Sequence, residues 1–350
     1  ILRCLVGSEM CIRDSTYTGF YTTVTNFSSD LMGFDNLQAG ALRPWEGTGS
    51  YYEEPHLASF LGRVNYTYDD RYVLTVNART DASSKFGANH KWGFFPSVSA
   101  AWNVSSEQFM KHITWIDNLK LRLGYGLAGN QGGIDSYTTM NLVRPNGVAP
   151  VGNSPVVTYE TLRNINPDLK WEVKHTFNAG FDVGFYGNRL LLSVNYYNSK
   201  TTDMLYNYRV SVPPFTYNTL LANIGSMRNS GTEISVGITP LKTKDMELNI
   251  NANITFQKNK LLSLNGMYNG EYISASEYTV IAGLDGAGFH GGYNNIVYQI
   301  VGQPLGVFYL PHCTGLVPDG NGGYKYEIAD LNGGGVNLED GEDRYVAGQA

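Results

Sequence analysis

Apolar and polar side chains alternate along the segment 61–79, and this alternation limits what the chain can fold into. Side chains of an extended strand point alternately to its two faces, so a period of two predicts β-strands. The polar break Asp69-Asp70-Arg71 divides the segment, which is therefore predicted to be an antiparallel hairpin. One face of the hairpin is mainly apolar. The other carries neutral polar side chains and arginines, namely Arg63, Asn65, Thr67, Thr75, Asn77 and Arg79.

The same alternation returns along the rest of the chain. Further strands are predicted at 92–104, 119–127, 176–185, 190–196, 234–238 and 246–257. Their connections alternate between short and long when the one medium link, 105–117, is counted as short. The short links are 69–71, 186–188 and 240–245, and the longer ones are 81–91, 131–168, 207–222 and 258–300. Outer-membrane barrels place short turns on the periplasmic side and longer loops outside, so this order favours an all-β, antiparallel, up-and-down transmembrane β-barrel.

Composition excludes two other classes of protein. The net charge is -6 and the sequence has no basic cluster, so a nucleic-acid partner is not expected. No run approaches the ~18 apolar residues of a membrane helix, so a helical membrane protein is excluded. Aromatic residues make up 13% of the chain and charged residues only 16%. These proportions suit many strands joined by turns, and alternating barrel strands average out as weakly polar.

A secreted, soluble β-sandwich with a carbohydrate-binding or adhesive role remains the alternative. Three features favour the barrel: polar faces built from Asn, Ser, Thr and Gly, aromatic residues near strand ends, and runs of ten or more residues, which is the length that crosses a bilayer. The two folds differ in where Phe181, Leu192 and Ile250 lie. A sandwich buries them against a second sheet, whereas a barrel exposes them on one curved sheet.

Both ends of the chain indicate an internal fragment. Residues 1–15, ILRCLVGSEMCIRDS, have no signal-peptide pattern and resemble a translated sequencing adapter, so we predict that they are a non-native artefact. Two of the three cysteines, Cys4 and Cys11, lie there, which leaves Cys313 without a disulfide partner. The chain also stops at Ala350 within a continuing pattern.

No catalytic or metal-binding constellation is present, so neither enzyme activity nor a cofactor is expected. The six histidines are scattered without metal-ligand spacing, and there is no phosphate-binding glycine loop. The segment 330–335 is similar to a calcium loop, but Gly334 stands where an Asp or Asn ligand is expected. We predict a structural turn there rather than a metal site.

Several longer motifs carry a family resemblance. They are RVNYTY at 63–68, RTDASSKF at 79–86, WGFFPSVSAAW at 92–102, LKLR at 119–122, GYGLAGN at 124–130, NPDLKWE at 166–172, YYNSKTTD at 196–203, NIGSMRNSGTE at 223–233 and GQPLG at 302–306. In this order they resemble the SusC/RagA-type TonB-dependent transporters of Bacteroidota outer membranes. The resemblance covers about residues 55–350, and the string 79–130 is its most specific part.

This resemblance implies a plugged barrel of 22 strands that imports oligosaccharides or peptides across the outer membrane. A SusD-like lipoprotein would serve as its lid, and TonB-ExbB-ExbD would supply energy through an N-terminal region that this chain lacks. Residues 16–350 would form about 8–10 strands of the barrel, without the plug and the C-terminal strands. Whether the substrate is a glycan or a peptide is left open.

The barrel interpretation divides the candidate site residues into two groups. Residues expected to line the lumen are Arg63, Asn65, Arg79, Arg122, Asn178, Asp182, Asn249, Asn251 and Asn253. Loop tyrosines expected to contact the substrate or the lid are Tyr137, Tyr159, Tyr217, Tyr268, Tyr272 and Tyr293. On the opposite strand face, Val64, Leu74 and Val76 should meet lipid. The turn 69–71 should be periplasmic, with Tyr66, Tyr68 and Tyr72 at that membrane interface.

Overall fold

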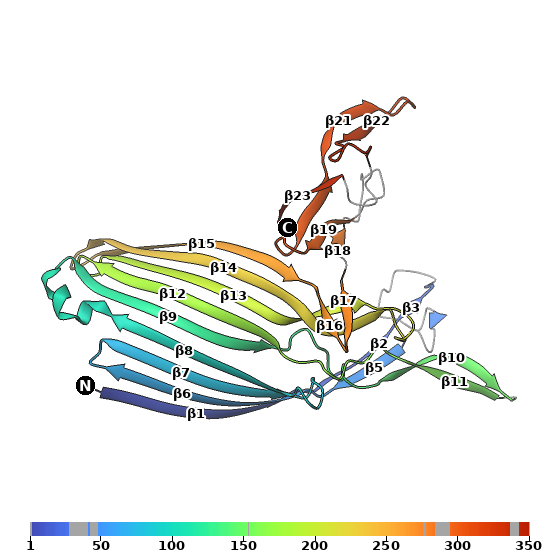
Figure 1. Cartoon of the computed structure of the whole chain (residues 1–350), viewed down its shortest axis with the longest axis horizontal. Helices are drawn as coiled ribbons and strands as arrows, with labels where there is room; N and C mark the ends of the chain where they lie inside the picture. Colours follow the sequence, from blue (N-terminus) through green and yellow to red (C-terminus); the bar gives the residue numbers. More distant parts are fainter. Residues whose placement is uncertain are drawn as a thin grey trace.

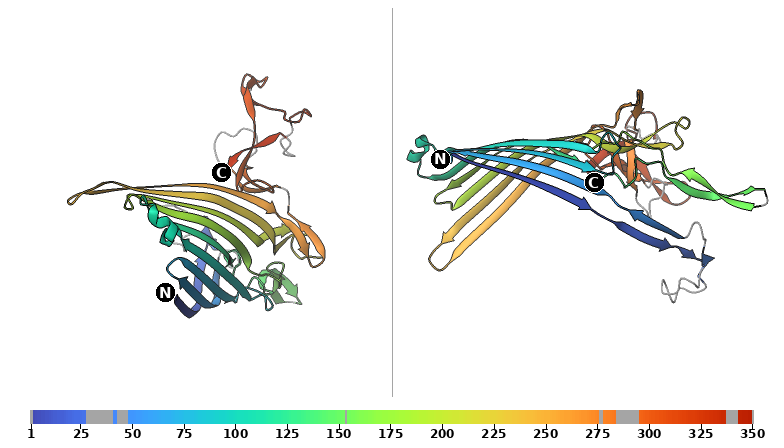
Figure 2. Two further views of the ribbon diagram at one scale, coloured as in Figure 1. Left: turned by 60° about the vertical axis from the view of Figure 1, so that its left-hand side comes forward. Right: turned by 90° about the horizontal axis from the view of Figure 1, so that it is seen from below.

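One antiparallel sheet of nine strands organises the computed structural model (Figure 1). The model describes residues 2–27, 41–42, 48–152, 154–275, 278–283, 295–336 and 343–349. The strands of the sheet, in spatial order, are β1 (Leu2–Asp14), β6 (His56–Tyr68), β7 (Tyr72–Ser83), β8 (Trp92–Asn103), β9 (Ile116–Asn130), β12 (Glu172–Phe185), β13 (Leu190–Arg209), β14 (Thr219–Lys242) and β15 (Glu247–Ser263). Spatial order follows chain order, which confirms the predicted up-and-down meander. The sheet arches across its strands (Figure 2).

The short connections gather at one end of the sheet and the long ones at the other (Figure 1). At the turn end, Asp69 and Asp70 have positive φ values of 52° each. Asn188 has a φ of 59° in the turn between β12 and β13. Short polar residues tolerate this left-handed conformation, which lets the chain reverse tightly. Between β8 and β9, two 3₁₀ helices follow each other, η2 (Val104–Ser106) and η3 (Gln108–His112).

Additional short strands lie at the loop end, and most were not predicted. The prediction that 131–168 is entirely loop is wrong, because β10 (Val143–Val151) and β11 (Ser154–Thr161) form a projecting hairpin there. The remaining short strands are β2 (Tyr17–Thr22), β3 (Val24–Thr25), β4 (Ala41–Leu42), β5 (Thr48–Glu53), β16 (Asn265–Tyr268), β17 (Glu271–Ser274), β18 (Tyr278–Gly283), β19 (Asn295–Ile300), β20 (Val307–Pro311), β21 (Cys313–Pro318), β22 (Tyr324–Ile328) and β23 (Arg344–Gln349).

Strand β1 lies within residues 1–15, which we predicted to be a non-native artefact. It pairs with β6 from Leu2 opposite Tyr68 to Asp14 opposite His56. Pairing on a sheet edge depends on backbone groups, which an unrelated extended segment also provides. That residues 1–15 are foreign to the natural protein therefore stays a prediction.

The apolar face of the large sheet is not covered by a second sheet in the described part of the chain. Leu74 is 42% exposed, Leu123 is 56% exposed and Ile250 is 51% exposed. Phe181 and Leu192 are only partly buried. The alternative of a soluble sandwich is therefore wrong, because such a fold would bury these side chains between two sheets. No helix among the described residues is long and apolar enough to cross a membrane.

The best-packed cluster lies at the loop end rather than in the middle of the sheet. It consists of Phe86, Phe95, Ile134, Leu169 and Trp171. The Trp171 ring centroid lies 4.7 Å from that of Phe86 and 5.5 Å from that of Phe95. The cluster joins the loop after β7 and the segment before β12 to strand β8, so two long connections are fixed to the sheet.

Candidate functional site

The polar face of the sheet is continuous across eight strands. One row of directly paired residues runs from β6 to β15 through its centre: Asn65, Thr75, Ser99, Gly124, Asn178, Tyr197, Gly231 and Gln257. Except at Gly231, which lies between Ser230 and Thr232, each of these positions has an apolar neighbour that points to the other face. The pairing register thus collects separate polar positions of the sequence into one wall, which we call the polar wall.

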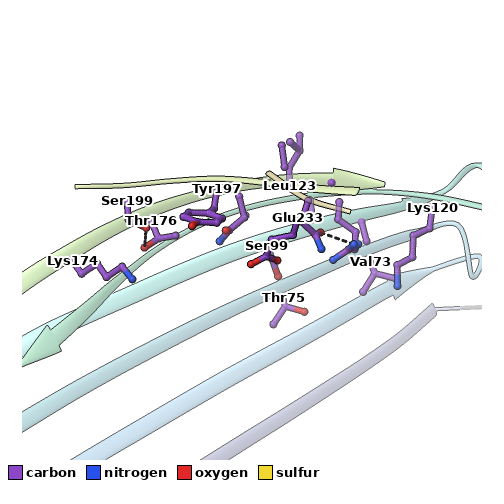
Figure 3. A pocket seen from close by; sticks show the side chains of 18 of the residues that line it. Val73, Thr75, Ser99, Lys120, Leu123, Lys174, Thr176, Tyr197, Ser199 and Glu233 are labelled. Carbon is purple, nitrogen blue, oxygen red and sulfur yellow. Dashed lines mark hydrogen bonds between the residues drawn. The ribbon is translucent and has the colours of Figure 1, made fainter. Parts of the chain in front are cut away.

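Two hollows lie on the polar wall. The larger has a volume of about 810 Å³, and Figure 3 shows the side chains around it. Lys120, Arg122, Lys174 and Glu233 bring charges of both signs to its lining. The smaller, of about 690 Å³, is lined by Asp182, Asn251 and Asn253 among others. Neutral polar groups with a few charges suit a wet, solute-filled space, in contrast to the apolar face behind them.

Arg122 is the centre of the most connected polar network on this wall. Its Nη2 atom donates to Asp182 Oδ1 at 2.8 Å and to Asn195 Oδ1 at 2.7 Å. Its Nε atom lies 2.8 Å from Asp182 Oδ2, an ion-pair contact without hydrogen-bond geometry. Ser193 Oγ also donates to Asp182 Oδ1, at 2.7 Å. Residues from β9, β12 and β13 are therefore held together by one ion pair and its neighbours.

The network needs a residue without a side chain at position 180. A Cβ atom there would lie 2.5 Å from Asn195 Oδ1 and 2.7 Å from the backbone oxygen of Val194. Gly180 stands directly opposite Arg122 in the register. The glycine leaves room for the Arg122 guanidinium group to reach across β12 to Asn195.

Smaller networks involve the other residues predicted to line the lumen. Arg63 Nε donates to Asn77 Oδ1 at 2.6 Å, and Asn77 Nδ2 donates to Ser97 Oγ at 3.0 Å. Thr75 Oγ1 donates to Asn65 Oδ1 at 2.8 Å. Arg79 Nε lies 2.8 Å from an oxygen of the buried Asp81.

All nine residues lie on this one face by strand alternation: Arg63, Asn65, Arg79, Arg122, Asn178, Asp182, Asn249, Asn251 and Asn253. Arg122 and Asp182 contact each other directly. Thr239 Oγ1 donates to Asn249 Oδ1 at 2.7 Å, near the turn end. That these residues contact a plug or a substrate stays a prediction.

The aromatic cluster at the loop end was not predicted as part of the site. Phe95 shares the polar face with Ser97 and Ser99, and its ring lies across Gly93 and Gly129, where a Cβ would come within 2.4 Å and 2.1 Å of it. Trp171 Nε1 donates to the backbone oxygen of Lys91 at 3.1 Å. The available sequence signal was an aromatic residue, Phe95, on a strand face that otherwise carries Gly93, Ser97 and Ser99.

The loop tyrosines fall into two structural groups. Tyr137, Tyr217 and Tyr268 are partly buried. The Tyr137 hydroxyl accepts a hydrogen bond from the backbone N–H of Glu54 at 3.0 Å, and the Tyr217 hydroxyl donates to the backbone oxygen of Thr161. Tyr268 packs against the buried cluster around Tyr208 and Leu220.

The second group is open to solvent. Tyr159 and Tyr272 are each 64% exposed. Tyr159 lies on the projecting hairpin and Tyr272 on β17. Tyr293 lies outside the described residues. Of the described candidates, these two have the most ring surface available for a substrate or a lid protein, and their contact with either stays a prediction.

The segment 330–335 forms a turn around one carboxylate. Asp330 accepts backbone N–H hydrogen bonds from Gly333 at 2.6 Å and from Gly335 at 2.9 Å. These bonds favour the charged form and hold the pKa of Asp330 below its ordinary value. Among the described residues, no group of three or more His, Cys, Asp or Glu side chains could hold a metal ion.

An arched antiparallel meander with one exposed apolar face and one polar face defines the wall of an outer-membrane β-barrel. Comparison with known families agrees with this class. Residues 9–343 match the family described as TonB dependent receptor-like, beta-barrel, and the chain belongs to that family.

Similar proteins place the chain within the SusC/RagA type. It is 34% identical over 247 residues to the TonB-dependent receptor SusC of Bacteroides thetaiotaomicron. The aligned region covers 65% of this chain and 24% of SusC. It is 36% identical over 248 residues to a TonB-dependent receptor of Formosa agariphila. This aligned region covers 69% of this chain and 24% of that receptor. The chain thus spans about a quarter of the length of these curated relatives.

Solved structures agree on the fold. A structure of the RagAB peptide importer in the closed-closed state matches with a TM-score of 0.68 and 24% identity, covering 100% of this chain and 35% of that chain. Another, of the RagAB peptide transporter, gives a TM-score of 0.67 and 24% identity over 94% of this chain and 34% of that chain. The chain is therefore part of a SusC/RagA-type outer-membrane protein.

Proposed function

We propose that this chain forms part of the barrel wall of an active importer that brings oligosaccharides or peptides across the outer membrane. A SusD-like lipoprotein closes the importer on the outside, and TonB-ExbB-ExbD supplies the energy. The observation that carries the proposal is the continuous polar wall, with its hollow of about 810 Å³, behind an exposed apolar face. A wall of this kind separates lipid from a water-filled path for a polar solute.

Two further observations support the proposal. The chain belongs to a family of TonB-dependent receptors, and similar solved structures are described as peptide importers. The polar wall offers amide and hydroxyl groups from Ser99, Asn178 and Asn195 beside the cations Lys120 and Lys174. Such groups can hydrogen-bond either sugar hydroxyls or peptide groups, so both substrate classes remain in the proposal.

The experiment uses the complete transporter that carries this chain, expressed in a Bacteroidota host from which the native gene has been removed. Uptake of fluorescent oligosaccharides and of fluorescent peptides is measured with and without a protonophore. We expect uptake of one substrate class to depend on the gene and to fall at least tenfold when the proton gradient is dissipated. A tag on the transporter should recover a SusD-like lipoprotein from gently solubilised membranes.

Different results would overturn different parts of this proposal. Uptake that persists with the protonophore would contradict energy coupling and indicate a passive pore. Uptake of neither substrate class would contradict the proposed substrates. Purification without a lipoprotein partner would contradict the proposed lid. The class that is taken up decides between glycan and peptide.

A further inference from the structure

A row of basic residues crosses four strands on the apolar, lipid-facing side of the sheet. His175 on β12 pairs with Lys200 on β13, Lys200 with Arg228 on β14, and Arg228 with Lys260 on β15. Lys200, Arg228 and Lys260 are exposed, and His175 is partly buried with its Nδ1 atom 3.1 Å from the Tyr125 hydroxyl. We call these four residues the basic row. Separate positions of the sequence meet here only because of the register.

The basic row has no acidic partner on its own face. The outward-pointing positions of β12 to β15, taken at every second residue from 173 to 185, 190 to 202, 228 to 238 and 250 to 260, contain no Asp or Glu. Their charged or titratable members are His175, Lys200, Arg228, Lys258 and Lys260. Within the described chain, Lys200, Arg228 and Lys260 make no ion pair. Asp203, close to Lys200 along β13, is paired with Lys170 at 2.7 Å.

The basic row lies at the loop end of a wide apolar band. On β13 the band starts at Leu190, directly after the turn, and continues through Leu192, Val194 and Tyr196. Lys200 follows Leu190 by ten residues. Ten residues extend about 33 Å along a strand, or roughly 25 Å along the membrane normal at a strand tilt of about 40°. This distance matches the apolar band of about 25 Å that outer-membrane barrels present to lipid. The basic row is therefore at the outer headgroup level.

Like charges placed directly opposite each other on neighbouring strands repel and destabilise a sheet. Two such contacts occur here, between Lys200 and Arg228 and between Arg228 and Lys260. An anion shared by the row would remove this repulsion, and arginine and lysine both bind phosphate oxygens. We propose that the basic row binds a phosphate-bearing headgroup of a lipid in the outer leaflet. The apolar band directly below it receives the acyl chains of the same lipid.

This proposal depends on the membrane position of the sheet and not on which substrate is imported. The experiment uses the complete transporter in a neutral detergent, and measures the temperature at which the folded barrel is lost on a heated gel. Three probes are compared at equal concentration: diphosphoryl lipid A, its dephosphorylated form, and inorganic phosphate. The test variant is Lys200→Gln with Arg228→Gln. The matched control is Lys242→Gln with Lys244→Gln, which removes the same charge at the turn end.

We expect diphosphoryl lipid A to raise the unfolding temperature of the native protein and of the control variant. The test variant should lose more than half of this rise, and Arg228→Lys should keep most of it. Equal rises in the native protein and the test variant would overturn the proposal. A full rise in the unfolding temperature with the dephosphorylated lipid would overturn the proposal, because it would show that only the acyl chains bind. A full rise with inorganic phosphate would also overturn it, because it would show a site for a free anion. If the test variant does not assemble, Lys260→Gln at the end of the row is measured instead, with the same criteria.

Discussion

The Arg122 guanidinium group is accommodated within the polar wall by a precise combination of neighbours. Asp182 provides the counter-charge, Asn195 and Ser193 supply oxygens around it, and Gly180 leaves the space between them. Charge-assisted hydrogen bonds of this kind are stronger than neutral ones and hold a long side chain in one place. The three strands β9, β12 and β13 are joined through their side chains as well as through their backbones.

Replacing Gly180 by valine should therefore destabilise the barrel. Overpacking costs about 1–3 kcal/mol when the surroundings cannot move, and here one of the atoms that a Cβ would meet is the backbone oxygen of Val194, at 2.7 Å. The measurement is the loss of the folded form of the complete transporter on a heated gel. Gly62→Val is the control, because a Cβ at Gly62 would have nothing within 4 Å. Equal losses in both variants would show that the Arg122 network does not depend on the glycine.

At the scale of the strand, each element has two chemically different faces. Stacked aromatic rings mark both ends of the outer face, with Tyr72 and Trp102 at the turn end and Phe60 and Trp92 at the loop end. Their ring centroids lie 6.3 Å and 6.1 Å apart. Aromatic girdles of this kind occur at the two interfaces of a membrane barrel. Between them, on β6 and β7, Val64 lies opposite Val76.

A charge placed on this band should prevent assembly of the barrel. Val64→Arg is expected to cost about 2–4 kcal/mol, the value for an arginine on the lipid face near the middle of a bilayer. The neighbouring substitution Asn65→Arg adds the same side chain to the polar face, and should have little effect. The measurement is the amount of heat-modifiable transporter recovered from outer membranes. Normal assembly with Arg at both Val64 and Leu74 would contradict the lipid-facing assignment.

The strands of the large sheet could be predicted because their period-two pattern directly reports burial and exposure. The hairpin of β10 and β11 could not, because Pro145, Pro150 and Pro155 read as turn signals. In a two-stranded ribbon both strands are edges, so a residue without an N–H is tolerated there. Pro150 even pairs with Pro155.

The sequence could also predict which residues belong to the polar wall, but not which of them contact each other. Alternation assigns Arg122 and Asp182 to one face, whereas their ion pair depends on a register between segments 60 residues apart. The roles of Tyr137 and Tyr217 depend on backbone partners that are 83 and 56 residues away along the chain. The basic row exists only once four strands are aligned. A single sequence does not contain these alignments, because long-range register is set by the assembled sheet.

At the scale of the whole molecule, the sheet separates two environments with one layer of backbone. Its nine strands follow one another in space as they do in the chain, and β1 and β15 are its two outermost strands. Within the described chain they are not paired with each other, so both edges present unpaired N–H and C=O groups, except where Leu261 on β15 bonds to Gly302 and Gln303. In water such groups are satisfied by solvent. In a bilayer each one costs several kcal/mol, which is why membrane strands occur in closed barrels.

The 350-residue chain on its own should therefore not insert stably into lipid. We expect that, refolded with phospholipid vesicles, it gives aggregated or surface-bound protein in which protease cleaves the strands between β6 and β15. The complete transporter under the same conditions should give protected strands and a heat-modifiable monomer, because its additional strands pair both edges. Fragment size by mass spectrometry after proteolysis distinguishes the two outcomes. A protected, monomeric and heat-modifiable form of the isolated chain would mean that β1 and β15 can meet and close a small barrel, and would require a different account of how this sheet contributes to the lumen.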